Sequence, residues 1–203
     1  MRREVISKET RENLEILKKA SLLEDFYLAG GTGLALQLKH RLSFDLDFFT
    51  SKEINTKTLV KKLKRAGTIS IEREAEDTLT CVFNKTRLTF LRYDYPLLFA
   101  LKKIEEVKVA QSKDIGCMKI DAISSRGTKK DFIDVFFLCQ TTISLKGLLT
   151  LFKKKYKDID YNMLHILKSL VYFDDADKDP MPMTLIPVSW EEVKNFFRKE
   201  IKI

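Results

Sequence analysis

The fold is decided by Leu28-Ala-Gly-Gly-Thr-Gly-Leu-Ala-Leu-Gln-Leu-Lys-His-Arg-Leu-Ser-Phe-Asp-Leu-Asp-Phe-Phe49. A short apolar run up to Ala29 predicts a strand, the pair Gly30 and Gly31 predicts a turn, and residues 33–38 predict a helix. Residues 43–49 then alternate polar and apolar side chains with period two, which is typical of a half-buried strand. The order strand, glycine turn, helix, strand predicts a fold that combines a sheet with helices.

Two motifs in this stretch can carry chemistry. Asp45 and Asp47 are two apart on the predicted strand, so both carboxylates are expected on one face, about 6–7 Å apart, where a hard cation such as Mg²⁺ would relieve their repulsion. At the upstream turn, Gly30 and Gly31 would let a phosphate approach the backbone at a helix N-terminus, and Thr32 adds a hydroxyl. A solvated strand face or a tight turn would explain either motif alone. Together they predict a nucleoside triphosphate site.

The remaining sequence predicts further strands and then only helices. Upstream, residues 8–23 have the apolar spacing of an amphipathic helix, and residues 56–65 repeat that pattern downstream. Three β-prone runs follow at 68–71, 78–83 and 87–93, the last two joined by a predicted turn at 84–86. Helices are expected over 114–124, 129–140, 144–155, 161–173 and after Ser189, with the acidic residues 174–180 as a connector.

Composition sets the class of protein. Of the 203 residues, 44% are hydrophobic, which excludes a disordered chain. The net charge of +8 biases encounters toward polyanions. No apolar run approaches the roughly 18 residues of a membrane span, and the three cysteines form no paired motif, so we expect a soluble protein of the cytoplasm. We predict an α/β half over residues 1–110 and a helical half over 111–203, packed as one unit.

The quoted stretch resembles the first motif of the AbiEii/AbiGii-type nucleotidyltransferase toxins, within the polymerase-β-like nucleotidyltransferase superfamily. A later block, Met118-Lys119-Ile120-Asp121-Ala122, then Arg126 and residues 130–135, is similar to the family's second block of Lys, Arg and Asp. The resemblance implies an α+β fold with a mixed sheet, flanking helices and a C-terminal helical bundle. It also implies transfer of a nucleotide from an NTP to a hydroxyl, with RNA, tRNA in particular, as the acceptor.

The resemblance also implies roles for individual residues. Asp45 and Asp47 would bind the metal, Mg²⁺ or Mn²⁺, while Lys119 and Asp131 would complete the catalytic set. The implied nucleotide contacts are Gly31, Thr32, Ser43, Lys119 and Arg126. An antitoxin protein is an implied partner, in a toxin–antitoxin or phage-defence pair.

The sequence departs from the superfamily at one point, which leaves an alternative open. Many members carry a third carboxylate on a later strand, but residues 87–91 have none, and the next acidic residue is Asp94. The proton-acceptor role would then shift to Asp131 or Asp134. The alternative is a catalytically silent domain that keeps the fold and binds nucleotide, RNA or a protein.

Other side chains have two interpretations each. His40, beside Arg41, would either contact phosphate or have a structural role. His165 lies in a predicted apolar helix and is expected to be a core or interface residue. Two basic clusters would follow an RNA backbone or be solvated helix faces. They comprise Lys57, Lys61, Lys62, Lys64 and Arg65, and Lys153, Lys154, Lys155 and Lys157.

Overall fold

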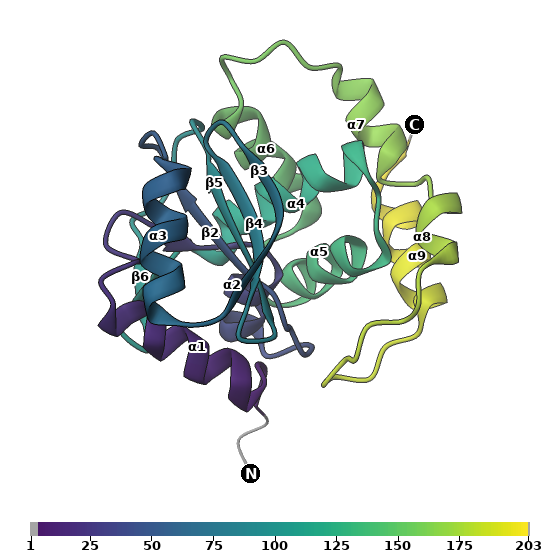
Figure 1. The fold of residues 1–203 in the computed structure, drawn as a ribbon. Coiled ribbons are helices and arrows are strands. Elements are labelled where there is room, and N and C mark those ends of the chain that lie inside the picture. Colours follow the sequence, from purple (N-terminus) through teal and green to yellow (C-terminus); the bar gives the residue numbers. More distant parts are fainter. Residues whose placement is uncertain (1–3, 203) are drawn as a thin grey trace.

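A mixed seven-stranded sheet lies at the centre of the computed structural model, which describes residues 4–202 (Figure 1). The strand order is β3-β4-β5-β2-β1-β7-β6, with β2 parallel to β5 and antiparallel to β1. The predicted α+β class with a mixed sheet is therefore confirmed. The strands are β1 (Tyr27–Leu28), β2 (Leu46–Thr50), β3 (Ile69–Ala75), β4 (Thr78–Phe83), β5 (Thr86–Arg92), β6 (Lys102–Ile104) and β7 (Val107–Val109).

Helices cover both faces of the sheet. The two helices α1 (Lys8–Lys19) and α3 (Thr56–Ala66) lie on one face, and α2 (Gly30–Leu38), α4 (Ser112–Ser125) and α5 (Lys129–Thr141) lie on the other (Figure 1). The outer layer, beyond α4 and α5, consists of α6 (Leu145–Lys155), α7 (Met163–Ser169), α8 (Asp174–Lys178) and α9 (Trp190–Glu200).

The alternation along β2 explains the two layers. Leu46 and Phe48 are fully buried toward α1 and α3, where Phe48 stacks on Phe90 at 5.2 Å between ring centroids. Phe49 points the other way, into the core beneath α4 and α5, and Asp47 shares that face. Because a fully buried Phe or Leu contributes about 1.5–3 kcal/mol, this register is strongly fixed, and it aims Asp47 at the helical side.

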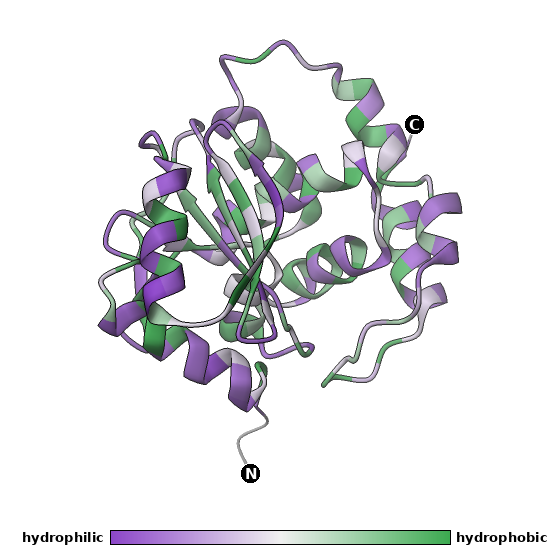
Figure 2. Cartoon of the chain, in the orientation of Figure 1, coloured by the Kyte–Doolittle hydropathy of each residue, from purple (hydrophilic) through white to green (hydrophobic). Residues whose placement is uncertain are grey.

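The helical side has its own apolar core. Phe132 of α5 touches Phe173, Trp190 and Phe197, with ring centroids 5.2–5.8 Å apart. Figure 2 shows the apolar faces of these helices turned toward one another. The last strand ends at Val109 and α4 begins at Ser112. The proposed division into an α/β half and a helical half near residue 110 thus falls where the chain changes from strands to helices. Within residues 4–202, no single helix is long and apolar enough to cross a membrane.

Several predicted element boundaries were wrong. The first helix ends at Lys19 because Ser21 takes a left-handed conformation, with φ 53°. The hairpin of β6 and β7 was missed because its turn places Glu105 and Glu106 at φ 49° and 64°, without the Gly or Asn that normally marks such a turn.

Two further expectations need correction in the outer layer. The expected helix over 161–173 is restricted to α7, Met163–Ser169. The acidic segment predicted as a connector forms a short helix, α8, because Ala176 is buried against the apolar core.

Candidate functional site

A cleft of about 650 Å³ opens between one end of the sheet face and α4, with Lys130 at the start of α5 on its edge. Its floor is the face of β2 and β5 that carries Asp47 and Thr89, and its far wall is α4. The cleft brings together most of the residues that the sequence singled out: Gly30, Gly31, Ser43, Asp45, Asp47, Lys119 and Arg126. Thr32 and Asp131 lie behind its walls and do not line it.

The loop before β2 holds the carboxylate pair in place. The sequence predicted Asp45 within the strand, but Asp45 lies one residue before β2. The hydroxyl of Thr32 fixes this loop, because it donates to the Asp45 carbonyl and lies 2.8 Å from the Ser43 hydroxyl. Thr32 therefore positions the pair, and its oxygen is already engaged within the protein.

The glycine pair is needed for close packing of site side chains. Gly30 has φ +58°, and a Cβ there would overlap the carboxylate of Asp47. A Cβ on Gly31 would overlap the guanidinium of Arg41. Larger residues would push both charged groups away from the start of α2, whose first N–H groups have no partner inside the helix.

Asp45 and Asp47 have no cation within ion-pair distance anywhere in residues 4–202. Burial raises the pKa of Asp47, the charge of Asp45 raises it further, and Lys119 acts in the opposite sense. Thr89, directly opposite Asp47 in the parallel ladder, donates its hydroxyl to that carboxylate. The β5 residue paired with Asp47 is therefore a threonine and not a carboxylate.

The donor set fits a hard divalent cation that shares its coordination with a ligand. Within the described chain, no three His, Cys, Asp or Glu side chains gather closely enough to hold a metal alone. Mg²⁺ is commonly bound by one or two carboxylates, with substrate phosphates and waters supplying the other oxygens. Two unpaired carboxylates at an open cleft match that pattern.

A buried ion cluster lies behind the wall of the cleft, centred on Asp134 of α5. Lys119 Nζ lies 2.7 Å from Asp134 Oδ2 and 2.6 Å from Asp131 Oδ1. Arg41 donates twice to Asp134, from Nε at 2.7 Å and Nη2 at 2.9 Å. His40 Nε2 donates to the same carboxylate at 2.7 Å. Arg126 reaches Asp131 from the cleft side at 3.1 Å.

The cluster neutralises its own charges. Burial disfavours the charged form of Asp134, but Lys119 and Arg41 outweigh it and hold the pKa of Asp134 well below its usual range. The pKa of Asp131 is lowered for the same reason, by Lys119 and Arg126 against burial. Burial would lower the pKa of Lys119, yet the two carboxylates raise it. All of these groups are therefore ionised at neutral pH.

The predicted roles of Lys119 and Asp131 must be set against this geometry. The Lys119 side chain lines the cleft, but the residue is only 5% exposed and its ammonium faces two carboxylates. Asp131 is fully buried and bonded to Lys119, Arg126 and Thr128. Their assignment as catalytic or phosphate-binding groups stays a prediction, as does that of Arg126.

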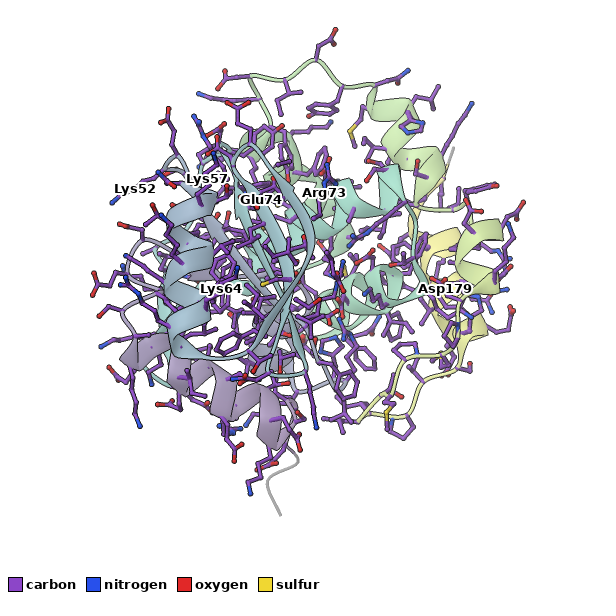
Figure 3. The ribbon with its side chains drawn as sticks, in the orientation of Figure 1. Lys52, Lys57, Lys64, Arg73, Glu74 and Asp179 are labelled. Carbon is purple, nitrogen blue, oxygen red and sulfur yellow. The ribbon has the colours of Figure 1, made fainter. Side chains whose placement is uncertain are left out.

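The histidines and lysine clusters lie away from the carboxylate pair. His40 is fully buried against Asp134, whereas His165 is exposed, which rules out the core position expected for it and leaves the interface alternative as a prediction. The first basic cluster lies on α3, across the sheet from the cleft helices, where Figure 3 labels Lys57 and Lys64. In the second, Lys155 is not solvated: it is fully buried and pairs with Asp114 at 2.9 Å.

Sequence reasoning missed a segment that borders the cleft. Residues 180–188, here called the strap, connect α8 to α9 and contribute Met181, Pro182 and Met183 to the lining. Leu42 N–H donates to the Met183 carbonyl at 2.9 Å, and Leu185 N–H donates to that of His40 at 2.7 Å. In Figure 1 the strap reaches from α8 and α9 toward the loop after α2. No local sequence signal announces a contact across about 140 residues.

Comparison with known proteins identifies sequence relatives. A family model described as "Nucleotidyl transferase AbiEii toxin, Type IV TA system" matches residues 14–105, which include the glycine pair and both aspartates. Uncharacterized protein aq_aa25 of Aquifex aeolicus is 39% identical over 202 residues, covering 97% of this chain and 96% of its own.

Solved structures share the fold at low identity. MenT4, a nucleotidyltransferase toxin of Mycobacterium tuberculosis, superposes with a TM-score of 0.60 at 14% identity, over 96% of this chain and 84% of its own. JHP933 from Helicobacter pylori superposes with a TM-score of 0.54 at 19% identity, over 97% of this chain and 91% of its own. These likenesses extend through the helical side, which the family model does not reach.

Proposed function

The chain belongs to the AbiEii nucleotidyltransferase toxin family, and we propose that it binds a divalent cation and an NTP through the Asp45/Asp47 pair. The nucleotide is transferred to a hydroxyl of RNA, with tRNA favoured, in the cytoplasm, and the chain is the toxin of a toxin–antitoxin or phage-defence pair. The observation that carries the metal proposal is the pair itself: two carboxylates in an open cleft with no cation of residues 4–202 within ion-pair distance.

The transfer is a displacement at the α-phosphorus. The acceptor oxygen forms a new bond to that phosphorus, the bond to the β-phosphate oxygen breaks, pyrophosphate leaves, and the hydroxyl proton is released to water. A cation held by Asp45 and Asp47, Mg²⁺ or Mn²⁺, would supply charge stabilisation at the phosphoryl oxygens. The residues of the chain then orient the two substrates on either side of the pair.

Cations of the cleft supply contacts for the triphosphate. Lys130, at the start of α5, is exposed, lines the cleft and has no acidic partner within ion-pair distance among residues 4–202. Arg126 is bonded to Asp131, but its side chain is 58% exposed and can reach a ligand. We assign the triphosphate to Lys130 and Arg126, together with Gly31 and Ser43, which border the pair. Lys119 would contact the triphosphate only if it broke one of its ion pairs with Asp131 and Asp134.

A transfer assay tests the proposal. Wild type, Asp45→Asn, Asp47→Asn and the control Asp158→Asn are incubated with Mg²⁺ or Mn²⁺, each labelled NTP and total RNA. We expect labelled RNA from wild type and control, and a loss of about a thousandfold or more in both site variants. Asp158 is exposed and lies outside the cleft, so it reports any general effect of removing one charge. Equal labelling by all four proteins would refute the site.

A second candidate is a catalytically silent domain that binds nucleotide or a partner. Thr89 at the β5 position opposite Asp47 favours it, because a hydroxyl is a poorer metal ligand than a carboxylate. In the same assay, NTP binding that depends on Asp45 and Asp47 without any labelled product identifies this case.

A further inference from the structure

One helix, α3, carries most of the net positive charge of the chain. It holds five cations and no acidic side chain, so it contributes +5 to the net charge of +8. Four of the five, Lys57, Lys61, Lys64 and Arg65, follow helical spacing along one exposed face and are here called the α3 patch. None of the four has an acidic partner within ion-pair distance among residues 4–202.

The stability of α3 does not account for this arrangement. Lys61 has one cation a turn before it and two a turn after it, and like charges at these spacings destabilise a helix. Lys57 lies in the first turn, where the helix dipole disfavours a cation. On α1, by contrast, Lys8 and Lys18 each pair with a glutamate of the same helix. Charge that weakens its own helix and has no partner in the fold is available to an external polyanion.

The α3 patch fits a phosphate backbone better than a membrane or a protein. Leu59, Val60 and Leu63 are buried beneath the helix, and none of the large exposed apolar side chains of residues 4–202 lies on α3. The patch therefore lacks the apolar anchor that an interfacial membrane helix or the centre of a protein interface needs. Lys and Arg alone are sufficient to bind nucleic acid phosphates, without reading a sequence. Figure 2 colours the outer side of α3 as hydrophilic.

The α3 patch and the cleft lie on opposite sides of one uncovered sheet edge. On one face α3 packs against β3 and β4, and on the other the cleft lining reaches Thr80 of β4. Thr80 pairs with Arg73 of β3, which is the edge strand, and six of the seven β3 residues are exposed. Figure 3 labels Lys57 and Lys64 on α3 and Arg73 on this edge strand. A ligand lying across the edge can contact the patch and still extend toward the cleft.

We infer that the α3 patch docks the phosphate backbone of a paired RNA stem at a site outside the cleft. The choice of RNA rests on the proposed function, but the docking itself needs neither NTP nor turnover. Because recognition is by charge, binding should be insensitive to the sequence of the stem and should weaken steeply as salt is added.

Binding of a fluorescent blunt-ended RNA hairpin, without NTP or divalent cation, tests the site. Lys61→Ala/Lys64→Ala removes two charges of the patch, and Lys61→Arg/Lys64→Arg keeps them. The control, Lys153→Ala/Lys154→Ala, removes the same charge from two exposed lysines in the last turn of α6, where the helix dipole favours cations. Fluorescence anisotropy at several salt concentrations gives the affinity and its salt dependence for each protein.

We expect the patch alanine variant to bind the hairpin roughly tenfold more weakly at low salt. The slope of log K against log salt concentration should become shallower by about 1.8, because each lost phosphate contact removes about 0.9. The arginine variant and the α6 control should bind as wild type does. NTP affinity and melting temperature should not fall in any variant.

The inference is overturned if the patch alanine variant and the α6 control lose affinity equally, since only net charge would then matter. It is also overturned if Lys61 and Lys64 matter more for a DNA hairpin, or for vesicles rich in anionic lipid, than for the RNA hairpin.

The docking site and the proposed enzyme fail separately. Patch-dependent RNA binding without transfer, when NTP and Mg²⁺ are supplied, would keep the docking site and reject the enzyme. Asp47-dependent transfer by a protein whose RNA binding is indifferent to Lys61 and Lys64 would do the reverse.

Discussion

Two pairs of aspartates lie near the same cleft and differ in what faces them. Asp131 and Asp134 on α5 contact Lys119, Arg41, His40 and Arg126, and their charges are balanced inside the protein. Asp45 and Asp47 share a wall with these groups but contact none of them within ion-pair distance. Charge that the chain balances itself belongs to the architecture, and charge left unbalanced is available to a ligand.

The largest expected effect breaks the balanced pair. Asp134→Ala removes the carboxylate shared by Lys119, Arg41 and His40, which leaves buried Arg41 without a carboxylate and Lys119 with one of its two. We expect the free energy of unfolding to fall by about 3–5 kcal/mol, measured by urea denaturation. A loss below about 1 kcal/mol would mean that the cluster is not a structural element, and the comparison between the two pairs would fail.

The next effect removes the central cation. Lys119→Met keeps much of the side-chain volume but leaves Asp131 and Asp134 with fewer counter-charges, so we expect a loss of about 2–3 kcal/mol. The loss should depend on pH. Because the folded protein lowers the pKa of both carboxylates, their stabilising contribution is full above the unfolded value of about 3.9 and disappears as pH falls through the folded value.

Denaturation at several pH values checks the sign of that dependence. The stability difference between wild type and Lys119→Met should be constant from about pH 8 to 6 and shrink toward pH 3. A gap that widens in acid would contradict the assigned pKa directions. Unchanged stability together with a loss of NTP affinity would instead identify Lys119 as a phosphate-binding residue.

A smaller effect sharpens the contrast on the cleft side. Lys130→Ala removes a cation with no acidic partner in the described structure, so the melting temperature should not change. NTP affinity should fall about tenfold, close to 1.4 kcal/mol, while nucleoside affinity stays the same. Isothermal titration measures both, with Lys146→Ala on α6 as an exposed lysine control. Equal NTP affinity in both variants would remove Lys130 from the triphosphate site.

The smallest effect has the opposite sign. Burial raises the pKa of Asp47, so its charged form is disfavoured in the folded protein, and Asp47→Asn should stabilise the chain by less than about 1 kcal/mol at pH 7 without added metal. Thermal denaturation of wild type and variant provides the comparison. A destabilisation above 1 kcal/mol would show that the Asp47 charge has a structural partner.

The sequence predicted the parts of the site that are local. Period-two alternation located β2, and the glycine pair with the two aspartates pointed to the floor of the cleft. The same reasoning could not show that Arg41 and Lys119 converge on Asp134, because α2, α4 and α5 meet only through tertiary packing. It also missed the hairpin of β6 and β7, whose turn is built from two glutamates in left-handed conformations.

The loop that precedes Asp45 is held between the two ends of the described chain. Ser43 N–H donates to Val5 near the N-terminus, while Leu42 and His40 bond to residues 183 and 185 of the strap. A ribosome releases the chain from the N-terminus, and parts with local contacts fold first. The sheet can therefore form while the helical half is being made, but the loop gains its last hydrogen bonds only after residue 185 has emerged. The order of synthesis thus delays the completed cleft until the strap has been made.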